Sequence, residues 1–326
     1  MSIDLDLVMR DQLIERREKV ATALSTVGPD PQLTALLRDV DAALERFASG
    51  SYGVCERCHD GVETDRLIAN PLERFCLGCL TADEQRALED DLTLASQIQR
   101  GLLPCRDLRV DGWHFDYRYE PARVVSGDYV DIIPNGERDL YFILGDVSGK
   151  GVAASMLMAK LHAVFRTLIP LGLRVDQLTE RASRLFGDST LPGQFATLIL
   201  GQVTAGCGAV SICNAGHPPG LLNRRGKVEQ IPATGFPMGM FPSQKFSVFD
   251  VNLERGDNLL LYTDGVPDTR NQFSEEYGMS RLMDFAGGCS SLAAGELVAH
   301  CLGEVSKFRQ GSARFDDISI MGIRRE

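Results

Sequence analysis

The chain has 326 residues, of which 44% are hydrophobic and 24% are charged, and its formal net charge is −11. This length exceeds the usual size of one domain and predicts two domains with a sizeable core. The negative charge, and the lack of a basic run interleaved with aromatic residues, argue against a broad nucleic-acid surface, because such surfaces neutralise phosphates with Lys and Arg. We therefore expect a protein partner and no nucleic acid.

Targeting signals and cysteine usage indicate the compartment. The N-terminal segment has no apolar core of signal-peptide length, and no later stretch offers the roughly 18 uninterrupted apolar residues of a membrane span. We therefore expect a cytoplasmic protein with no membrane segment. Nine cysteines fit a reducing compartment, because four cluster as metal ligands and five are scattered. We interpret the scattered ones as reduced packing residues: Cys105, Cys207, Cys213, Cys289 and Cys301.

The first region, to about Gly50, predicts a helical hairpin. It carries two helical patterns that are broken at residues 28–31, a Gly-Pro-Asp-Pro run. Apolar residues recur at helical spacing along the second arm from Leu33 to Phe47, and the pattern stops at Gly50, where a C-cap glycine belongs. One face of the second arm must therefore pack on the first.

Two Cys-x-x-Cys pairs follow the hairpin, Cys55 with Cys58 and Cys76 with Cys79. Each pair lets two thiolates on one tight turn reach the same ion, and four sulfur ligands complete a tetrahedron. The pattern predicts one structural Zn²⁺ without an open position for a catalytic water. The alternatives are chance clustering and a redox pair, and His59 could substitute as a ligand.

A further helical pattern runs from Thr81 to Leu103, and Pro104 ends it. Its apolar residues form a narrow seam through Leu88, Leu92, Ala95 and Leu102. We interpret residues 81–104 as a connecting helix, which either pairs with itself in a homodimer or packs only on its own domain.

The pattern changes after Pro104, where short β-rich runs alternate with glycine-containing turns. Strands are predicted over residues 140–144, 196–203, 208–213 and 258–262, and helices over 152–169 and 291–309. Residues 105–326 therefore form a predicted α+β domain of ordinary size.

The segments around the first cysteine pair, from Val40 to Cys55 and from Arg66 to Pro71, resemble the DksA/TraR zinc-finger family. The resemblance covers about residues 5–90 and implies a first domain at 1–90. In that family a helical hairpin enters the secondary channel of RNA polymerase and acts through acidic residues at its tip, which implies RNA polymerase as a partner. Here the arms are short and the tip offers only Asp30. We favour reuse of the fold as a dimerisation or sensor module.

Four acidic motifs in the second region underlie a catalytic hypothesis. Hard divalent cations prefer oxygen ligands, and phosphoryl transfer needs cations that neutralise charge. The motifs place acids beside glycine turns or at the ends of apolar runs: Asp128 with Asp131, then Asp146, then Asp264, then Asp316 with Asp317. Asp131 is expected on the same side of a turn or helical start as Asp128. Singly, each could be an ordinary turn aspartate; together they fit a two-metal site between packed sheets.

From about Leu92 to Glu326, the order, spacing and flanking residues of these motifs resemble the PPM-type phosphatases, in particular the SpoIIE/RsbU branch. The resemblance implies an α/β sandwich of two packed β-sheets flanked by helices. It also implies a metal-dependent protein serine/threonine phosphatase. In that branch the usual substrate is a phosphorylated STAS-domain anti-sigma-factor antagonist, whose dephosphorylation frees a sigma factor.

Carried onto this chain, the family pattern implies two Mn²⁺ or Mg²⁺ ions. Its ligands are Asp146 with the Val147 carbonyl between both ions, Asp128 on one ion, and Asp264 and Asp316 on the other. Asp131 and Asp317 are then outer-shell acids, although Asp317 could exchange roles with its neighbour. The ions would acidify a bridging water that attacks phosphorus in line, without a phosphoenzyme.

Two further segments are shared with the branch. Residues 214–219, Asn-Ala-Gly-His-Pro-Pro, follow a strand, and His217 is either a general acid or a structural residue that holds the turn. Residues 95–104 resemble the helical linkers that transmit a sensory signal, so activation by rearranged helices is a hypothesis. Ser126 and Pro267 depart from the branch pattern, but neither change removes a ligand.

The alternative function is a DksA-like RNA-polymerase-binding or scaffolding protein with a silent phosphatase domain. The complete acidic set favours the enzyme, since a retired phosphatase would be free to lose it. A cysteine phosphatase is not supported, because the scattered cysteines are not followed by an arginine at the required spacing.

Overall fold

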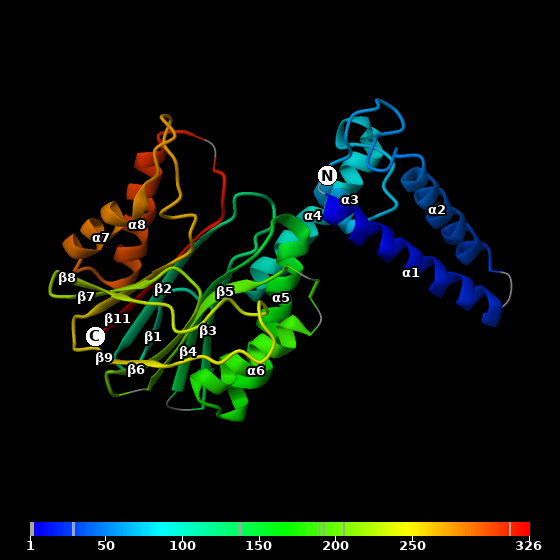
Figure 1. Cartoon of the computed structure of the whole chain (residues 1–326). Helices are drawn as coiled ribbons and strands as arrows, with labels where there is room; N and C mark the ends of the chain where they lie inside the picture. The colour runs from blue at the N-terminus through cyan, green and yellow to red at the C-terminus, as the bar shows by residue number, and fades with distance from the viewer. Residues whose placement is uncertain are drawn as a thin grey trace. The chain divides into compact units, whose positions relative to one another are not determined.

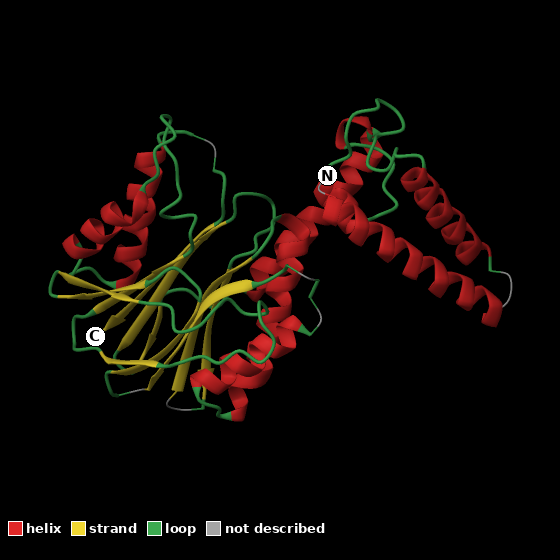
Figure 2. Ribbon diagram, viewed as in Figure 1, coloured by secondary structure: helices red, strands yellow, loops and turns green. Residues whose placement is uncertain are grey.

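The computed structural model divides the chain into two units, residues 1–92 and 93–326. The first unit is mainly helical, and the second contains β-sheets with flanking helices (Figures 1 and 2). The described residues are 3–27, 30–136, 139–188, 190–191, 193–204, 206–312 and 314–326.

Helices α1 (Ile3–Val27) and α2 (Pro31–Ala48) form the predicted hairpin. Buried Leu13, Val40 and Ala43 make the contact between the two arms. The Asp30 side chain caps α2 by accepting hydrogen bonds from the backbone N–H groups of Gln32 and Leu33, at 2.8 and 2.9 Å. Of the predicted break at residues 28–31, the Gly-Pro pair at 28–29 lies outside the described residues.

The rest of the first unit is short elements around the cysteines. Helix α3 (Thr64–Ala69) precedes the second cysteine pair. The 3₁₀ turn η1 (Leu77–Cys79) begins directly after Cys76, and helix α4 (Ala82–Leu102) follows. The bounds of α4 agree with the predicted connecting helix. The predicted seam residues Leu88, Leu92, Ala95 and Leu102 are all partly buried. Leu94 and Ile98, which lie outside the seam, are 55% and 61% exposed, and Gln99 is buried.

The second unit is built on two antiparallel sheets. Their strand orders are β1-β2-β11-β10-β7-β8 and β3-β4-β5-β6-β9. The strands are β1 (Leu108–Val110), β2 (Trp113–Glu120), β3 (Tyr129–Asn135), β4 (Asp139–Val147), β5 (Ala196–Thr204), β6 (Ala209–Ala215), β7 (Gly220–Arg224), β8 (Lys227–Ile231), β9 (Phe249–Asn252), β10 (Asn258–Tyr262) and β11 (Ile318–Arg325). All four predicted strands are present, and the prediction for β6 begins one residue too early.

Helices cover the outer face of each sheet, as Figure 2 shows. Helices α5 (Gly151–Leu168) and α6 (Val175–Gly187), joined by the turn η2 (Ile169–Leu171), pack on the five-stranded sheet. Helices α7 (Gly278–Gly288) and α8 (Ala294–Arg309) pack on the six-stranded sheet. A third apolar cluster, which includes Trp113, Phe142 and Met321, fills the space between the sheets. The predicted α/β sandwich is confirmed.

Helix α5 with η2, Gly151–Leu171, is long and apolar enough to cross a membrane by length and composition. Its Met158, Leu161 and Phe165 side chains are buried in the cluster under the five-stranded sheet. Packing of one apolar helical face on a sheet accounts for this composition.

The five scattered cysteines have different surroundings. Cys213 and Cys301 are buried, and Cys289 packs at the edge of the core beneath α7 and α8. The packing interpretation is wrong for Cys105 and Cys207, which are exposed in turns. A cysteine in a loop segment therefore does not by itself predict a buried packing residue.

Candidate functional site

The two sheets deliver acidic residues to the same end of the sandwich. Asp146 lies at the C-terminal end of β4, where β4 pairs with the start of β3 and hence with the turn that holds Asp128. Asp264 follows β10, and Asp316 precedes β11, which pairs antiparallel with β10 so that these two ends meet. Antiparallel pairing thus brings together four motifs that are far apart in sequence.

Asp128 joins the two sheets. Its side chain is 2% exposed, and its Oδ2 accepts hydrogen bonds from Thr263 Oγ1 at 3.0 Å and Ser319 Oγ at 2.6 Å. Both hydroxyls come from the opposite sheet, next to β10 and within β11. Burial, followed by the charge of Asp146, raises the pKa of Asp128 well above its usual range. No local sequence pattern predicts these two hydroxyl partners.

Two glycines allow the acidic motifs to approach closely. A Cβ on Gly127 would lie 3.0 Å from the Val147 carbonyl oxygen and 3.1 Å from Asp146 Oδ1. A Cβ on Gly265 would lie 1.9 Å from the Asp317 carbonyl oxygen. Gly265 leaves no room for a side chain and Gly127 leaves very little, so the turns at Asp128 and Asp264 run directly against the neighbouring acids.

The acids repel one another electrostatically. Burial, then the charges of Asp264, Asp316 and Asp317, raise the pKa of Asp146 to about 7. Partial desolvation and then the charge of Asp316 also raise the pKa of Asp264. A group of carboxylates with this mutual repulsion is a donor set suited to hard divalent cations, which relieve the repulsion when they bind.

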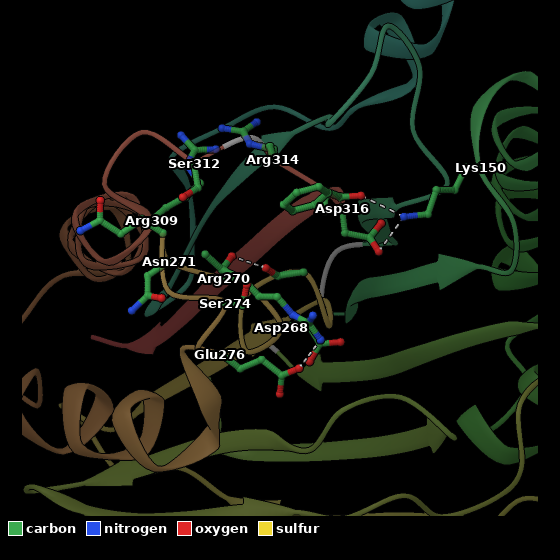
Figure 3. A pocket seen from close by; sticks show the side chains of 14 residues that line it. Lys150, Asp268, Arg270, Asn271, Ser274, Glu276, Arg309, Ser312, Arg314 and Asp316 are labelled. Carbon is green, nitrogen blue, oxygen red and sulfur yellow. Dashed lines mark hydrogen bonds and ion pairs between the residues drawn. The ribbon is translucent and has the colours of Figure 1, made fainter.

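The adjacent acids Asp316 and Asp317 have different partners. Asp317 accepts backbone hydrogen bonds from Ala122 at 2.7 Å and Gly127 at 3.1 Å, one on each carboxylate oxygen. Asp316 Oδ2 lies 3.0 Å from the Lys150 ammonium, which also donates to the Phe315 carbonyl (Figure 3). Asp317 therefore anchors the loop before Asp128, while Asp316 pairs with Lys150.

Asp131 does not join the other acids. The expected turn or helical start is wrong, because residues 129–135 form the extended strand β3, where alternate side chains point to opposite faces. The fully buried Asp131 carboxylate instead accepts two hydrogen bonds from Arg166 of α5, at 2.6 and 3.0 Å. Asp131 thus pairs with a helix on the outer face of the sheet.

His217 is part of a buried hydrogen-bond network. Its Nε2 lies 3.1 Å from the Tyr262 carbonyl oxygen, and its Nδ1 lies 2.9 Å from Thr197 Oγ1. Burial lowers the pKa of His217 to about 3. Since a carbonyl only accepts, Nε2 carries the proton and Nδ1 accepts from the hydroxyl. The ring ties β5 to β10, which is a structural arrangement.

We expect His217→Ala to lower the free energy of unfolding by about 2–4 kcal/mol, because it leaves buried polar groups of Thr197 and Tyr262 without partners. Turnover per folded molecule should change less than tenfold. Urea unfolding and steady-state kinetics check both values. A general acid would give the opposite result, a large loss of turnover with little loss of stability.

A cavity of about 580 Å³ lies beside Asp316 and Gly265. Its walls come mainly from the loop after β10 and the segment between α8 and β11, and Figure 3 shows Lys150 directed toward Asp316. The polar lining is mixed in charge: Lys150, Arg270, Arg309, Arg314, Asp268, Glu276 and Asp316.

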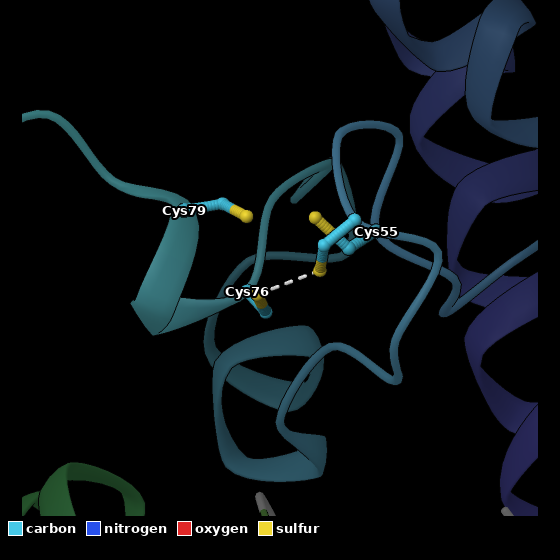
Figure 4. Close-up of side chains that lie close together, drawn as sticks. Cys55, Cys76 and Cys79 are labelled. Atoms are coloured by element: carbon cyan, nitrogen blue, oxygen red, sulfur yellow. Dashed lines mark hydrogen bonds between the residues drawn. The ribbon is translucent and has the colours of Figure 1, made fainter.

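The predicted cysteine cluster is present in the first unit. The Sγ atoms of Cys55, Cys58, Cys76 and Cys79 all lie within 4.8 Å of one another, and Figure 4 shows how the two turns point toward a common centre. The predicted four-cysteine zinc-binding site is therefore confirmed. His59 is exposed and has a positive φ of 63°, as part of the turn that follows Cys58.

Family comparisons agree with both units. The model of the SpoIIE family, described as stage II sporulation protein E, matches residues 136–326. The model of the prokaryotic dksA/traR C4-type zinc finger matches residues 50–85.

Comparison with individual proteins gives the same result. The chain is 31% identical to protein IcfG of Synechocystis sp. in an alignment of 263 residues that covers 72% of this chain and 41% of IcfG. It is 24% identical to phosphoserine phosphatase RsbU of Bacillus subtilis over 246 residues, 74% of this chain and 72% of RsbU. The SiaA-PP2C domain of Pseudomonas aeruginosa superposes with a TM-score of 0.67 at 20% identity, covering 76% of this chain and all of that domain.

Proposed function

The chain belongs to the SpoIIE family of PP2C-type serine/threonine phosphatases, and from this premise we propose that it hydrolyses phosphoserine or phosphothreonine on a protein partner. The observation that carries the proposal is the convergence of acids from both sheets at one end of the sandwich. Burial and then mutual repulsion raise the pKa values of Asp128, Asp146 and Asp264, which supports a role of the site as a receptor for cations.

We assign the donor set to two divalent cations, Mn²⁺ or Mg²⁺. Its members are Asp146 with the Val147 carbonyl for both ions, Asp128 for one, and Asp264 and Asp316 for the other. Asp317 is assigned to hold the loop of Asp128, because both of its carboxylate oxygens accept backbone N–H groups. When bound, such ions neutralise phosphoryl oxygens and acidify an attacking water.

The protein's own residues then orient the reaction. Thr263 and Ser319 fix one oxygen of Asp128, which leaves the other oxygen for a cation. Lys150 places a positive charge next to Asp316, where negative charge of a phosphoryl group would arrive. The cavity between the loop after β10 and the segment before β11 receives the polypeptide that carries the phosphate.

We propose a phosphorylated STAS-domain anti-sigma-factor antagonist as the substrate, in a cytoplasmic partner-switching pathway. The support is the similarity to RsbU, a phosphoserine phosphatase, along 74% of this chain. The zinc finger, with one Zn²⁺, is assigned a regulatory or dimerising role. The exposed Leu94 and Ile98 on α4 support a homodimer through this helix.

The purified chain should release phosphate from a phosphoserine peptide when Mn²⁺ or Mg²⁺ is added. EDTA should abolish the release, because carboxylates that repel one another cannot hold a phosphate without cations. Malachite-green detection of phosphate, with p-nitrophenyl phosphate as a second substrate, measures this. Absence of turnover from both the full chain and residues 93–326, with metal bound, would contradict the proposal and favour the binding or scaffolding function.

A further inference from the structure

Gln99 of α4 is a buried amide in a helix with an exposed outer face. It is 5% exposed, whereas Ile98 beside it is 61% exposed. Gln99 Nε2 donates to the Ser126 carbonyl oxygen at 2.7 Å, and Gln99 Oε1 accepts from the Ser126 backbone N–H at 3.0 Å. One side chain thus satisfies both backbone groups of a single residue. Among side chains only Asn and Gln offer this pair of groups, and Asn is one methylene shorter.

Ser126 begins the turn that carries Asp128. Its Oγ accepts a hydrogen bond from the Asp128 backbone N–H at 3.0 Å, and Ser126 itself is fully buried. The next residue, Gly127, donates to Asp317 at 3.1 Å and lies against Asp146. The turn is therefore hydrogen-bonded to Asp317 through Gly127 and to Gln99 through Ser126, and Gly127 also lies against Asp146.

We infer that Gln99 is a positioning residue that sets Asp128 in the geometry required for cation binding and turnover. This inference rests on the proposed phosphatase function and extends it to a residue outside the acidic motifs. Without the amide, two buried backbone groups of Ser126 lack partners, and the turn must shift to regain them. Displacement of Asp128 by about 1 Å is enough to reduce turnover strongly.

The test uses the full-length protein with three substitutions. Gln99→Leu removes both hydrogen bonds, and Gln99→Glu keeps the acceptor but loses the donor. Gln97→Leu is the matched control, because Gln97 is exposed on the same helix two residues away. Mn²⁺ dissociation constants are measured by electron paramagnetic resonance without substrate, and kcat and KM are measured with p-nitrophenyl phosphate.

We expect Gln99→Leu to weaken Mn²⁺ binding about tenfold or more and to lower kcat by a similar or larger factor, with KM nearly unchanged. Gln99→Glu should give a smaller effect in the same direction, and Gln97→Leu should behave as the wild type. Should Gln99→Leu fail to fold, Gln99→Glu alone carries the test.

A merely structural role for Gln99 would give a different result. Thr179→Val supplies the comparison, because Thr179 is a buried residue of α6 whose hydroxyl donates to the Val175 carbonyl at 2.7 Å. If Gln99 variants lower the melting temperature but bind Mn²⁺ as tightly as Thr179→Val, the inference is overturned. Tight Mn²⁺ binding by the wild type without any turnover would instead overturn the phosphatase proposal, while the Mn²⁺ titrations still decide the role of Gln99.

Discussion

Asp146→Asn should reduce Mn²⁺-dependent turnover of a phosphoserine peptide by at least about 10³-fold. Asp146 is the acid that interacts with the most others, since Asp264, Asp316 and Asp317 all raise its pKa. The amide keeps the size of the side chain but removes the negative charge, and an amide oxygen is a poor ligand for two cations at once. Initial rates at saturating Mn²⁺ give the comparison.

The same substitution should stabilise the protein when cations are absent. The pKa of Asp146 is raised to about 7 in the folded chain, so the folded state binds more protons than the unfolded state between about pH 4 and 7. The contribution of the Asp146 carboxyl to the free energy of unfolding therefore becomes less favourable as the pH rises through 7. In EDTA at pH 8, Asp146→Asn should be more stable than the wild type by roughly 1–3 kcal/mol after solvent screening.

Urea unfolding at pH 5.5 and pH 8 measures this difference, which should be smaller at the lower pH. Asp139→Asn is a matched control, because Asp139 lies at the opposite end of the same strand. A variant that loses turnover and is also less stable at pH 8 would show that Asp146 is needed for packing. Near-normal turnover would remove Asp146 from the reaction.

The acidic motifs could be predicted because each leaves a local mark in the sequence. The runs before Asp146 and Asp264 are apolar strands that end in an acid, and buried strands rarely place an acid there for packing. The hydrogen-bond partners of the acids have no such mark. Ser319 and Thr263 are ordinary strand-end residues until β11 pairs with β10 and faces β3. In the sequence, Gln99 likewise cannot be told apart from the other polar residues of an amphipathic helix.

The fold could be predicted as a class but not as a topology. The strand runs at 196–203 and 258–262 were visible from composition, whereas the short strands β7 and β8 and helix α6 were not among the predicted elements. The six-stranded sheet also pairs β2 with β11, elements from opposite ends of the domain. Such pairing depends on the packing of whole sheets, which no local pattern records. Asp131 was misplaced for the same reason, since its strand was taken for a turn.

The second large effect is expected in the zinc finger. Its buried core consists of Cys55, Val62, Leu67 and Cys76, so two of the four core residues are themselves ligands. Among the side chains that the structure describes in this segment, Val62 and Leu67 are the buried aliphatic ones that remain without zinc, which is far too little to fold about 35 residues. Structural zinc contributes about 10–16 kcal/mol in comparable finger peptides. Cys58→Ser should therefore unfold this segment and lower the bound zinc from one ion per chain to nearly none.

Zinc content by mass spectrometry and limited proteolysis measure the two effects. Trypsin should cut the Cys58→Ser variant rapidly at Arg57, Arg66 and Arg74, which in the folded finger are held by hydrogen bonds and ring contacts. Cys207→Ser is the control, because Cys207 is an exposed cysteine in the other unit. Full zinc content with an intact cleavage pattern in Cys58→Ser would mean that three sulfurs suffice, and that another ligand such as the adjacent His59 completes the site. His59 is exposed, so its side chain would have to turn inward before it could bind the zinc. We therefore expect the segment to unfold instead.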